Sequence, residues 1–468
     1  IQGKVPGSDR RADTYAEWVR LYDTPDSSAR EDVNGSSTGE TQAALRLHVL
    51  LLAEGVPVAQ ISDSIRSLLS QHWRDWQMTL VVGPNEVEAA RAAWHRFEDS
   101  RIEVSDRPPA ESGARACNRA MAHGTCPQVG IGGHATIGGL GPTSRMWGSS
   151  LDHVEEVEVV LANSSIVRAS EKENIDIFFA MKGAAAGFGI VSEFKVRTQA
   201  EPGEAVLYSY NFNGGSSADK ADAFKKWQKL ISDPDLSRKF ASQFILTEQF
   251  GAIVTGTFFG SQQEFDSLNI TARLPSKEES IIELTDWLGV VGHWTEDVAL
   301  EIVGGIQSNF YAKSLAYTKD DVIPDDAVDR LFDHIDNADK GGALWFIIWD
   351  LEGGAINDVK PNATAYGHRD ALFYHQAYAV NLLGKVGDKT RDFLKGVNDV
   401  ITDSLPDHTK GAYAGYVDLA LGEDSADLYW GGNVERLRKI KAAVDPNDVF
   451  HNPQSIRPEK KSAKLRLL

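Results

Sequence analysis

Apolar and polar positions along the chain change their spacing near residue 151, where strand-like patterns begin. Apolar residues concentrate in 154–161, the polar tripeptide Asn163–Ser165 follows, and a second apolar run covers 166–169. Two short apolar runs joined by a polar turn predict a β-hairpin. Apolar side chains at alternate positions of 187–198 predict another strand with one buried face.

The segments on either side of this region have helical spacing. Upstream, helices are expected around Gln42–Glu54 and Val87–Phe97, within a polar, irregular stretch. Downstream, turn signals at Glu201–Gly203 and Gly214–Ser217 indicate a domain boundary. Beyond it, helical stripes alternate with strand-like runs. The stripes are Phe224/Trp227/Leu230/Ile231, Val328/Leu331/Phe332/Ile335 and Phe393/Val397/Val400/Ile401, and the runs are 243–246, 253–259, 343–351, 372–380 and 412–421.

These patterns predict an α+β fold, in which a meander of strands carries helices on one face. A last helix is expected over 434–444, ending at Asp445-Pro446-Asn447. With 468 residues the chain exceeds the size at which single hydrophobic cores stop growing, so two domains are expected.

Charge and hydropathy exclude two classes of partner. A formal net charge of −19 argues against nucleic-acid binding, which needs a basic surface. A membrane span is not expected either, because no run of about 18 apolar residues occurs. Four N-x-[ST] sequons, at Asn34, Asn163, Asn269 and Asn362, and a start at Ile1 favour a secreted, extracellular glycoprotein. We expect a monomer, and we single out no metal ligands.

The run from His123 to Gly141 carries the first chemistry. Cys126 stands just ahead of two glycine clusters, Gly130/Gly132/Gly133 and Gly138/Gly139/Gly141. Glycines let a backbone approach a ligand and offer N–H groups to a pyrophosphate. A free Cys is more often a small buried hydrophobe, and Cys117 keeps that interpretation. The glycines do not follow the G-x-G-x-x-G pattern, so a Rossmann fold is not predicted.

Several motifs together make the chain recognisable. They are His123-Gly-Thr-Cys-Pro127, Val129-Gly-Ile-Gly-Gly-His134, Gly187-Phe-Gly-Ile-Val-Ser-Glu-Phe194, Tyr429-Trp-Gly-Gly-Asn433 and Asn452-Pro-Gln-Ser-Ile-Arg-Pro458. From about Ala116 to Pro458 the sequence resembles FAD-linked oxidases of the vanillyl-alcohol-oxidase type. Within them it is most similar to the berberine-bridge group and to fungal glucooligosaccharide (carbohydrate) oxidases.

The resemblance implies an FAD domain built from two segments, 1–203 and 422–468, with a substrate domain, 204–421, inserted between them. It implies that Cys126 bonds C6 of the flavin and that a His bonds the 8α-methyl group. It further implies that the cofactor lies against Gly124, Thr125, Gly130, Gly133, Gly138, Gly139, Ile190 and Val191.

The resemblance also assigns the reaction. Tyr416 stands at the position of the family's general base, and Asp350 at that of its carboxylate partner. From the residues alone, 411–418 is predicted to be a strand in which Tyr413 and Tyr416 face opposite ways. Gln376 falls at a sugar-contacting position, and Trp349 and Tyr311 are candidates for stacking on a pyranose, although both could be core residues. Ile348 occupies a position that is usually polar in carbohydrate oxidases.

Residues 1–115 lack the family's motifs. The family's Gly-Gly-His-Ser-Tyr loop has no counterpart, because 62–73 contains no glycine, and His72 is the nearest histidine. Either the loop has diverged, or the recorded sequence is unreliable there; the second is favoured because a glycine-free loop fits a buried pyrophosphate poorly. Peptide mass mapping of 1–115 decides between them, since a clean match to the printed sequence excludes the second.

Three functions follow from these patterns. The first is oxidation of the anomeric C1 hydroxyl of an oligosaccharide to the lactone, with O2 reduced to H2O2. The second is oxidation or dehydrogenation of secondary-metabolite or aromatic alcohols on the same scaffold, which Ile348 favours. The third is a carbohydrate-binding protein that has lost its flavin, which only segment 1–115 supports.

Overall fold

The computed structural model divides the chain into two compact units, residues 1–116 and 117–468. It describes three strands of the first unit. In the second it describes residues 119–125, 129–212, 215–248, 251–276, 278–284, 290, 309–381, 384–405 and 411–459. None of the helices in these ranges is long and apolar enough to cross a lipid bilayer. The domain limits at residues 203 and 421 stay a prediction.

The described part of the first unit is a parallel sheet. Its strands β1 (Leu47–Leu52), β2 (Trp76–Val81) and β3 (Ile102–Ser105) pair in that order. The helix expected around Gln42–Glu54 is therefore wrong at its centre. A short apolar run such as Leu-His-Val-Leu-Leu-Leu fits a strand of a parallel sheet, which is buried on both faces, as well as a helix. The helix expected around Val87–Phe97 lies outside the described residues.

A small antiparallel sheet begins the well-described part of the second unit. The expected hairpin is confirmed as β5 (Val154–Val160) and β6 (Ile166–Ser170), and β7 (Ile190–Val196) pairs with the other edge of β5. The expectation of one buried face along β7 is wrong, because a register shift opposite Glu158/Val159 reverses the alternation. Ile190 is consequently 59% exposed.

Helices and short segments from both sides of the sequence pack around this small sheet. They are α6 (Ile131–Ile137), α8 (Ile175–Met181), α16 (Ser425–Trp430) and α17 (Val434–Val444), with the short pair β4 (Arg119–Ala120) and β8 (Gln199–Ala200) beside the sheet's end. One hydrophobic core joins residues of 135–188 to residues of 412–456. The C-terminal helix predicted over 434–444 is confirmed and ends at Asp445.

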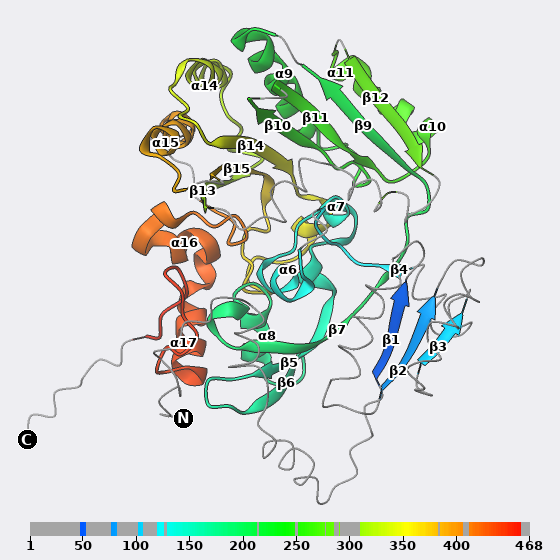
Figure 1. Ribbon diagram of the computed structural model, residues 1–468, viewed down its shortest axis with the longest axis vertical. Helices are drawn as coiled ribbons and strands as arrows, with labels where there is room; N and C mark the ends of the chain where they lie inside the picture. Colours follow the sequence, from blue (N-terminus) through cyan, green and yellow to red (C-terminus); the bar gives the residue numbers. More distant parts are fainter. Residues whose placement is uncertain are drawn as a thin grey trace, which may run out of the picture. The chain divides into compact units, whose positions relative to one another are not determined.

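The middle of the chain forms a seven-stranded antiparallel sheet with the order β12-β9-β11-β10-β14-β15-β13. Its strands are β9 (Ala205–Asn211), β10 (Gln243–Thr247), β11 (Gly251–Phe258), β12 (Glu278–Leu284), β13 (Asn309–Thr318), β14 (Leu344–Leu351) and β15 (Ala371–Asn381). Helices α9 (Ser217–Ile231), α14 (Asp325–Asn337) and α15 (Asp388–Ser404) are grouped along it (Figure 1).

The three predicted helical stripes are confirmed, and together they cover one face of this sheet. Phe224, Phe332 and Phe393 come from the three helices and share one core with Phe244 and Trp349 of the strands. Since neighbouring side chains of a strand point to opposite faces, the other face is left for the site. The short helix α10 (Gln262–Ser267) contacts β9, and the short helix α11 (Ile270–Arg273) contacts α9.

The strand expected over 412–421 is wrong. Gly411 makes a single bridge with Ala316, after which the Tyr416 amide donates to the Tyr413 carbonyl at 2.9 Å and closes a turn. The chain then continues into the 3-10 segment Leu419–Asp424, which the Asp418 side chain caps. Gly415 lies inside the turn, where a Cβ would be only 2.4 Å from the Tyr413 ring, so the turn accepts no side chain there.

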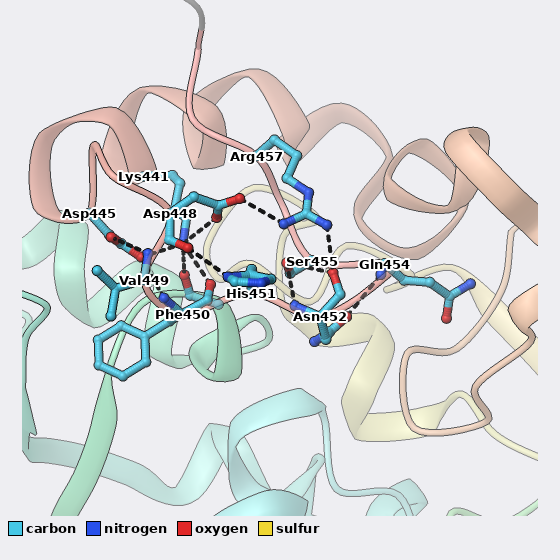
Figure 2. A network of polar contacts seen from close by, with 11 residues as sticks. Lys441, Asp445, Asp448, Val449, Phe450, His451, Asn452, Gln454, Ser455 and Arg457 are labelled. Atoms are coloured by element: carbon cyan, nitrogen blue, oxygen red, sulfur yellow. Dashed lines mark hydrogen bonds and ion pairs between the residues drawn. The ribbon is translucent and has the colours of Figure 1, made fainter. Parts of the chain in front are cut away.

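A buried ionic network fixes the last segment (Figure 2). The Lys441 ammonium is fully buried and contacts the Asp445 and Asp448 carboxylates at 2.5 and 3.0 Å. It also donates to the carbonyls of Gly187 and Phe450, each at 2.7 Å. Because Gly187 lies three residues before the first residue of β7, this network ties α17 to the segment that leads into the small sheet.

Candidate active site

The face of the large sheet that the three helices leave uncovered packs in part against the glycine-rich segment, and it carries a buried carboxyl group. Asp350 lies near the end of β14, directly between Gln243 of β10 and Tyr374 of β15. Its side chain accepts three hydrogen bonds, from the Gln243 amide at 2.5 Å, the Gln376 amide at 2.7 Å and the Tyr416 hydroxyl at 3.0 Å. Three strands and the 413–416 turn thus converge on one carboxyl group.

Burial controls the proton affinity of this group. Asp350 is 5% exposed, and burial raises the pKa of its carboxyl above the ordinary value, although the three donors favour the charged form. Burial and the adjacent Asp350 together raise the pKa of Tyr416 well above its ordinary value. The tyrosine is therefore a neutral hydroxyl, and the carboxylate beside it is a stronger base than an exposed Asp.

A second carboxyl group lies two residues further along the same side of the chain. Glu352 is 3% exposed, and its Oε2 atom has no hydrogen-bond partner among the described residues. Burial, and then the nearby Asp350, raise the pKa of Glu352 well above its ordinary value. Because two neighbouring buried carboxyls do not both ionise readily, the raised pKa of Glu352 favours its neutral form, while the guanidinium of Arg145 acts in the opposite direction.

A cluster of tyrosines connects the carboxyl groups to the glycine-rich segment. The rings of Tyr413 and Tyr416 meet edge to face, with centroids 5.0 Å apart, so the expectation that they face opposite ways is wrong. The ring centroids of Tyr374 and Tyr413 are 5.4 Å apart, and the Tyr374 hydroxyl forms a hydrogen bond of 2.9 Å with the Tyr366 hydroxyl. The Tyr413 hydroxyl in turn accepts a hydrogen bond from the Gly139 amide at 2.9 Å.

The two glycine clusters have different surroundings. Gly139 has φ +82°, and a Cβ there would be 2.3 Å from Ser150; one at Gly138 would be 2.7 Å from Tyr413. These two glycines therefore pack against the protein itself. At Gly130 and Gly133 a Cβ would meet no atom within 4 Å, and residues 129–133 are all exposed.

The open cluster suits a bound dinucleotide. Gly130–Gly133 offer an accessible backbone at the start of α6, and the exposed apolar side chains Val129 and Ile131 flank it, each 48% exposed. The buried Nε2 of His134 has no partner within the described part of the chain. Accessible backbone amides, apolar neighbours and an unfilled polar atom fit a cofactor with a pyrophosphate and an apolar ring.

The other residues expected to contact the cofactor are placed only in part. Gly124 and Thr125 are described, and Gly124 lies beside the His134 ring. Ile190 and Val191 begin β7, with Ile190 exposed and Val191 half-buried. Cys126 and the family's second tether, for which His72 was the nearest histidine, lie outside the described residues, as does Cys117.

Sheet alternation separates the three residues expected to contact substrate. Gln376 lies on the same face as Asp350 and is bonded to it. Trp349 lies on the opposite face, fully buried, with its ring 4.7 Å from that of Phe224. Tyr311 and Trp345 both pair with Ala379, one on each side of β15, so Tyr311 lies on the same helix-covered face as Trp345. The guanidinium carbon of Arg391, in α15, lies 5.4 Å from the centre of the Tyr311 ring. Trp349 and Tyr311 are thus core-side residues, and stacking on a sugar at Asp350 is not open to them.

Sequence reasoning missed Gln243, Glu352 and Tyr374. Gln243 is a polar residue at the start of an otherwise apolar strand, and Glu352 is an acid directly after one. An isolated polar side chain at the end of an apolar run is the signal that could have found both.

Comparison with known proteins places this geometry in a family. Residues 114–170 match the model of an FAD binding domain, and residues 412–457 match that named berberine and berberine like. The chain is 41% identical over 343 residues to the FAD-linked oxidoreductase sorD of Penicillium rubens, covering 73% of this chain and 72% of that protein. It is 34% identical to the glucooligosaccharide oxidase of Sarocladium strictum, over 73% of this chain and 70% of that one.

Solved structures agree with the sequence relatives and with the α+β expectation. A glucooligosaccharide oxidase from Acremonium strictum matches with a TM-score of 0.65 and 33% identity over 73% of this chain and 74% of that one. A chitooligosaccharide oxidase matches with a TM-score of 0.68 and 25% identity over 93% and 97% of the two chains. With these matches the predicted resemblance and fold class are confirmed, and the chain belongs to the FAD-linked oxidoreductases of the berberine-bridge type, with the vanillyl-alcohol-oxidase fold.

Proposed function

We propose that this protein oxidises a carbon that carries a hydroxyl group, and that Tyr416 and Asp350 remove the hydroxyl proton. The observation that carries the proposal is the 3.0 Å hydrogen bond from the Tyr416 hydroxyl to Asp350, on the uncovered face of the sheet. When bound, FAD supplies the hydride acceptor at N5 and passes both electrons to O2, which becomes H2O2.

The proton route follows from the two pKa directions. Tyr416 is neutral, so it takes the substrate proton only as it gives its own proton to Asp350. The raised pKa of Asp350 makes its carboxylate a better acceptor for that proton than an exposed Asp. Loss of a hydride and a proton turns the CH–OH group into a carbonyl. Gln243 and Gln376 hold the carboxylate in place during the transfer.

We further propose that FAD is attached covalently through Cys126 and that a histidine provides a second bond. A neighbouring structure, the glucooligosaccharide oxidase from Acremonium strictum with a TM-score of 0.65 and 26% identity, is described as carrying 6-S-cysteinyl, 8α-N1-histidyl FAD. The test is acid precipitation of wild type and Cys126→Ala. Flavin should stay with the wild-type pellet; release of all flavin from wild type contradicts the proposal.

The leading substrate is an oligosaccharide whose C1 hydroxyl becomes a lactone. Gln376 beside Asp350 supports it, as do the relatives named glucooligosaccharide, xylooligosaccharide and chitooligosaccharide oxidase, which are 32–34% identical. We propose that the protein is secreted and glycosylated, since Asn163, Asn269 and Asn362 of the sequons are exposed. A mass shift on glycosidase treatment of protein from the native host tests the glycosylation.

A row of isoleucines favours a second substrate class, alcohols with an apolar or aromatic body. Three isoleucines, Ile253, Ile245 and Ile348, lie directly opposite one another on β11, β10 and β14. They form a row of side chains next to the row that contains Asp350. Such side chains form no hydrogen bonds with sugar hydroxyls, and a buried unpaired hydroxyl is costly.

A peroxide assay separates the two classes. Cellobiose, maltose, chitobiose and xylobiose are compared with aromatic alcohols, for wild type and for Ile348→Gln. Turnover of a sugar supports the leading proposal, and turnover of aromatic alcohols alone supports the second. If the row governs the choice, Ile348→Gln should move the ratio of kcat/KM values toward sugars.

A further inference from the structure

A cavity lies apart from Asp350 and the glycine clusters. Its volume is about 590 Å³, within the range of small-molecule sites, about 300–1,000 Å³. It lies between the end of α7 (Ser144–Trp147), helices α8 and α17, and the 3-10 segment Gly354–Asp358. Neither Asp350 nor Tyr416 lines it.

The acids of this cavity are largely neutralised by partners. Asp152 forms a two-point ion pair with Arg369, both contacts at 2.8 Å, and accepts hydrogen bonds from Ser149 as well. Asp358 forms a two-point pair with Arg238 at 2.6 and 2.9 Å. Glu171, at the exposed edge, is the remaining acid of the lining.

A buried lysine in the wall of the cavity uses few of its N–H donors. Lys182 is 9% exposed, yet its ammonium makes only one hydrogen bond to the described residues, a long one of 3.3 Å to the Val154 carbonyl. It also lies 5.0 Å from the Phe178 ring centre. An ammonium has three N–H donors, so two are left to be satisfied by something in the cavity. Arg197 adds a second positive charge at the exposed edge.

The remaining walls are flat and apolar. Trp147, Phe178 and Phe179 line the cavity with Ile175, and the guanidinium of Arg436 lies 3.7 Å from the Phe179 ring centre. A buried lysine that forms no ion pair with the described residues and lies beside aromatic side chains is complementary to a planar ring that bears a negative charge.

We propose that this cavity is a binding site for a small aromatic carboxylate, whose charged group contacts Lys182 and whose ring packs against Phe178 and Trp147. The proposal is independent of the oxidation chemistry. The cavity is connected to the catalytic residues along the chain, because the segment Gly354–Asp358, which lines the cavity, follows β14 and its buried acids. A bound carboxylate would therefore contact the segment that follows the catalytic strand.

Equilibrium dialysis of the holoenzyme with 2-naphthoate and with 2-naphthamide tests the proposal. These probes share one ring system and differ in charge. Since hydrogen bonds to charged groups contribute more than neutral ones, naphthoate should bind about tenfold more tightly. Lys182→Met, similar in length and uncharged, should abolish the difference, and Arg197→Gln should reduce it. Lys439→Met removes an exposed lysine of α17 outside the cavity and should leave binding unchanged.

The Tyr416→Phe holoenzyme distinguishes this cavity from the catalytic site, and it should bind naphthoate as wild type does. Equal affinity of the wild type for the two probes overturns the proposal, as does a preference for naphthoate that survives Lys182→Met, or naphthoate binding that is lost in Tyr416→Phe. Should Lys182→Met fail to fold, Arg197→Gln decides, and unchanged affinity in that variant counts against the site. Since neither probe is an alcohol and no turnover is measured, the outcome does not depend on whether the protein oxidises alcohols.

Discussion

Two buried carboxylates, Asp350 in the large sheet and Asp445 after α17, show how the same group serves opposite purposes. Asp445 is fully buried beside the Lys441 ammonium and accepts hydrogen bonds from the Val449 and Phe450 amides at 2.8 and 2.9 Å. These partners hold the pKa of Asp445 below its ordinary value. Asp350 also has three donors, but all are neutral, and burial raises its pKa.

The difference between them is the cation. A full positive charge fixes the carboxylate of Asp445 in its ionised form, which stabilises the fold and leaves no chemistry to do. Without a cation, Asp350 keeps a proton affinity that the catalytic reaction can use. The predictions below disrupt one cluster at a time.

Removing the hydroxyl of Tyr416 should have the largest effect. General acid–base groups contribute roughly 10²–10⁴ in rate, so Tyr416→Phe should slow flavin reduction by that factor. Anaerobic stopped-flow absorbance of the flavin measures it. Thermal melting should be close to wild type, since the ring stays packed against Tyr413. A reduction rate within threefold of wild type contradicts the assigned role.

Removing the positive charge of Lys441 beside Asp445 should destabilise the fold without slowing the catalytic reaction. Lys441→Met leaves Asp445 buried without its partner, and breaking a buried ion pair costs about 3–5 kcal/mol. Denaturant titration measures the loss. The flavin-reduction rate of the folded fraction should be unchanged, and Lys439→Met, an exposed lysine of the same helix, should cost almost nothing. A stable Lys441→Met protein would argue against the network's role.

Acid should separate the two clusters. Asp445 and Asp448 have lowered pKa values, so their stabilisation is present above the unfolded value near 3.9 and is lost as pH falls through their folded pKa values. Asp350 has a raised pKa, so its active carboxylate is protonated at a higher pH. Activity should therefore fall, reversibly, at a pH where circular dichroism still reports a native fold. Coincident loss of both signals contradicts this separation.

The smallest effect is expected at Glu352. Because the raised pKa of Glu352 favours its neutral form, Glu352→Gln changes the charge little and keeps nearly the same shape, and kcat should stay within about threefold of wild type. Asp350→Asn, the matched change two residues away, should cost far more. Should Glu352→Gln instead shift the acid limb of the pH–rate profile, Glu352 carries charge in the working enzyme.

Much of the fold could be predicted from local patterns. Phe224, Trp227, Leu230 and Ile231 recur at helical spacing, so α9 was evident, and the hairpin of β5 and β6 followed from its turn. The glycine-rich segment and the C-terminal motifs identified the family. Pattern reasoning failed at β1, because a short apolar run has no period that separates a strand from a helix.

What the sequence by itself determined was therefore which elements form, which residues could carry chemistry and to which family the chain belongs. The tertiary structure alone decided that Asp350 and Trp349, adjacent in sequence, serve opposite faces, because only the packing of α9, α14 and α15 shows which face is covered. It also decided that Tyr416 turns back onto Asp350. Charge and proton affinity depend on burial and on partners distant in the sequence, and no local pattern records these.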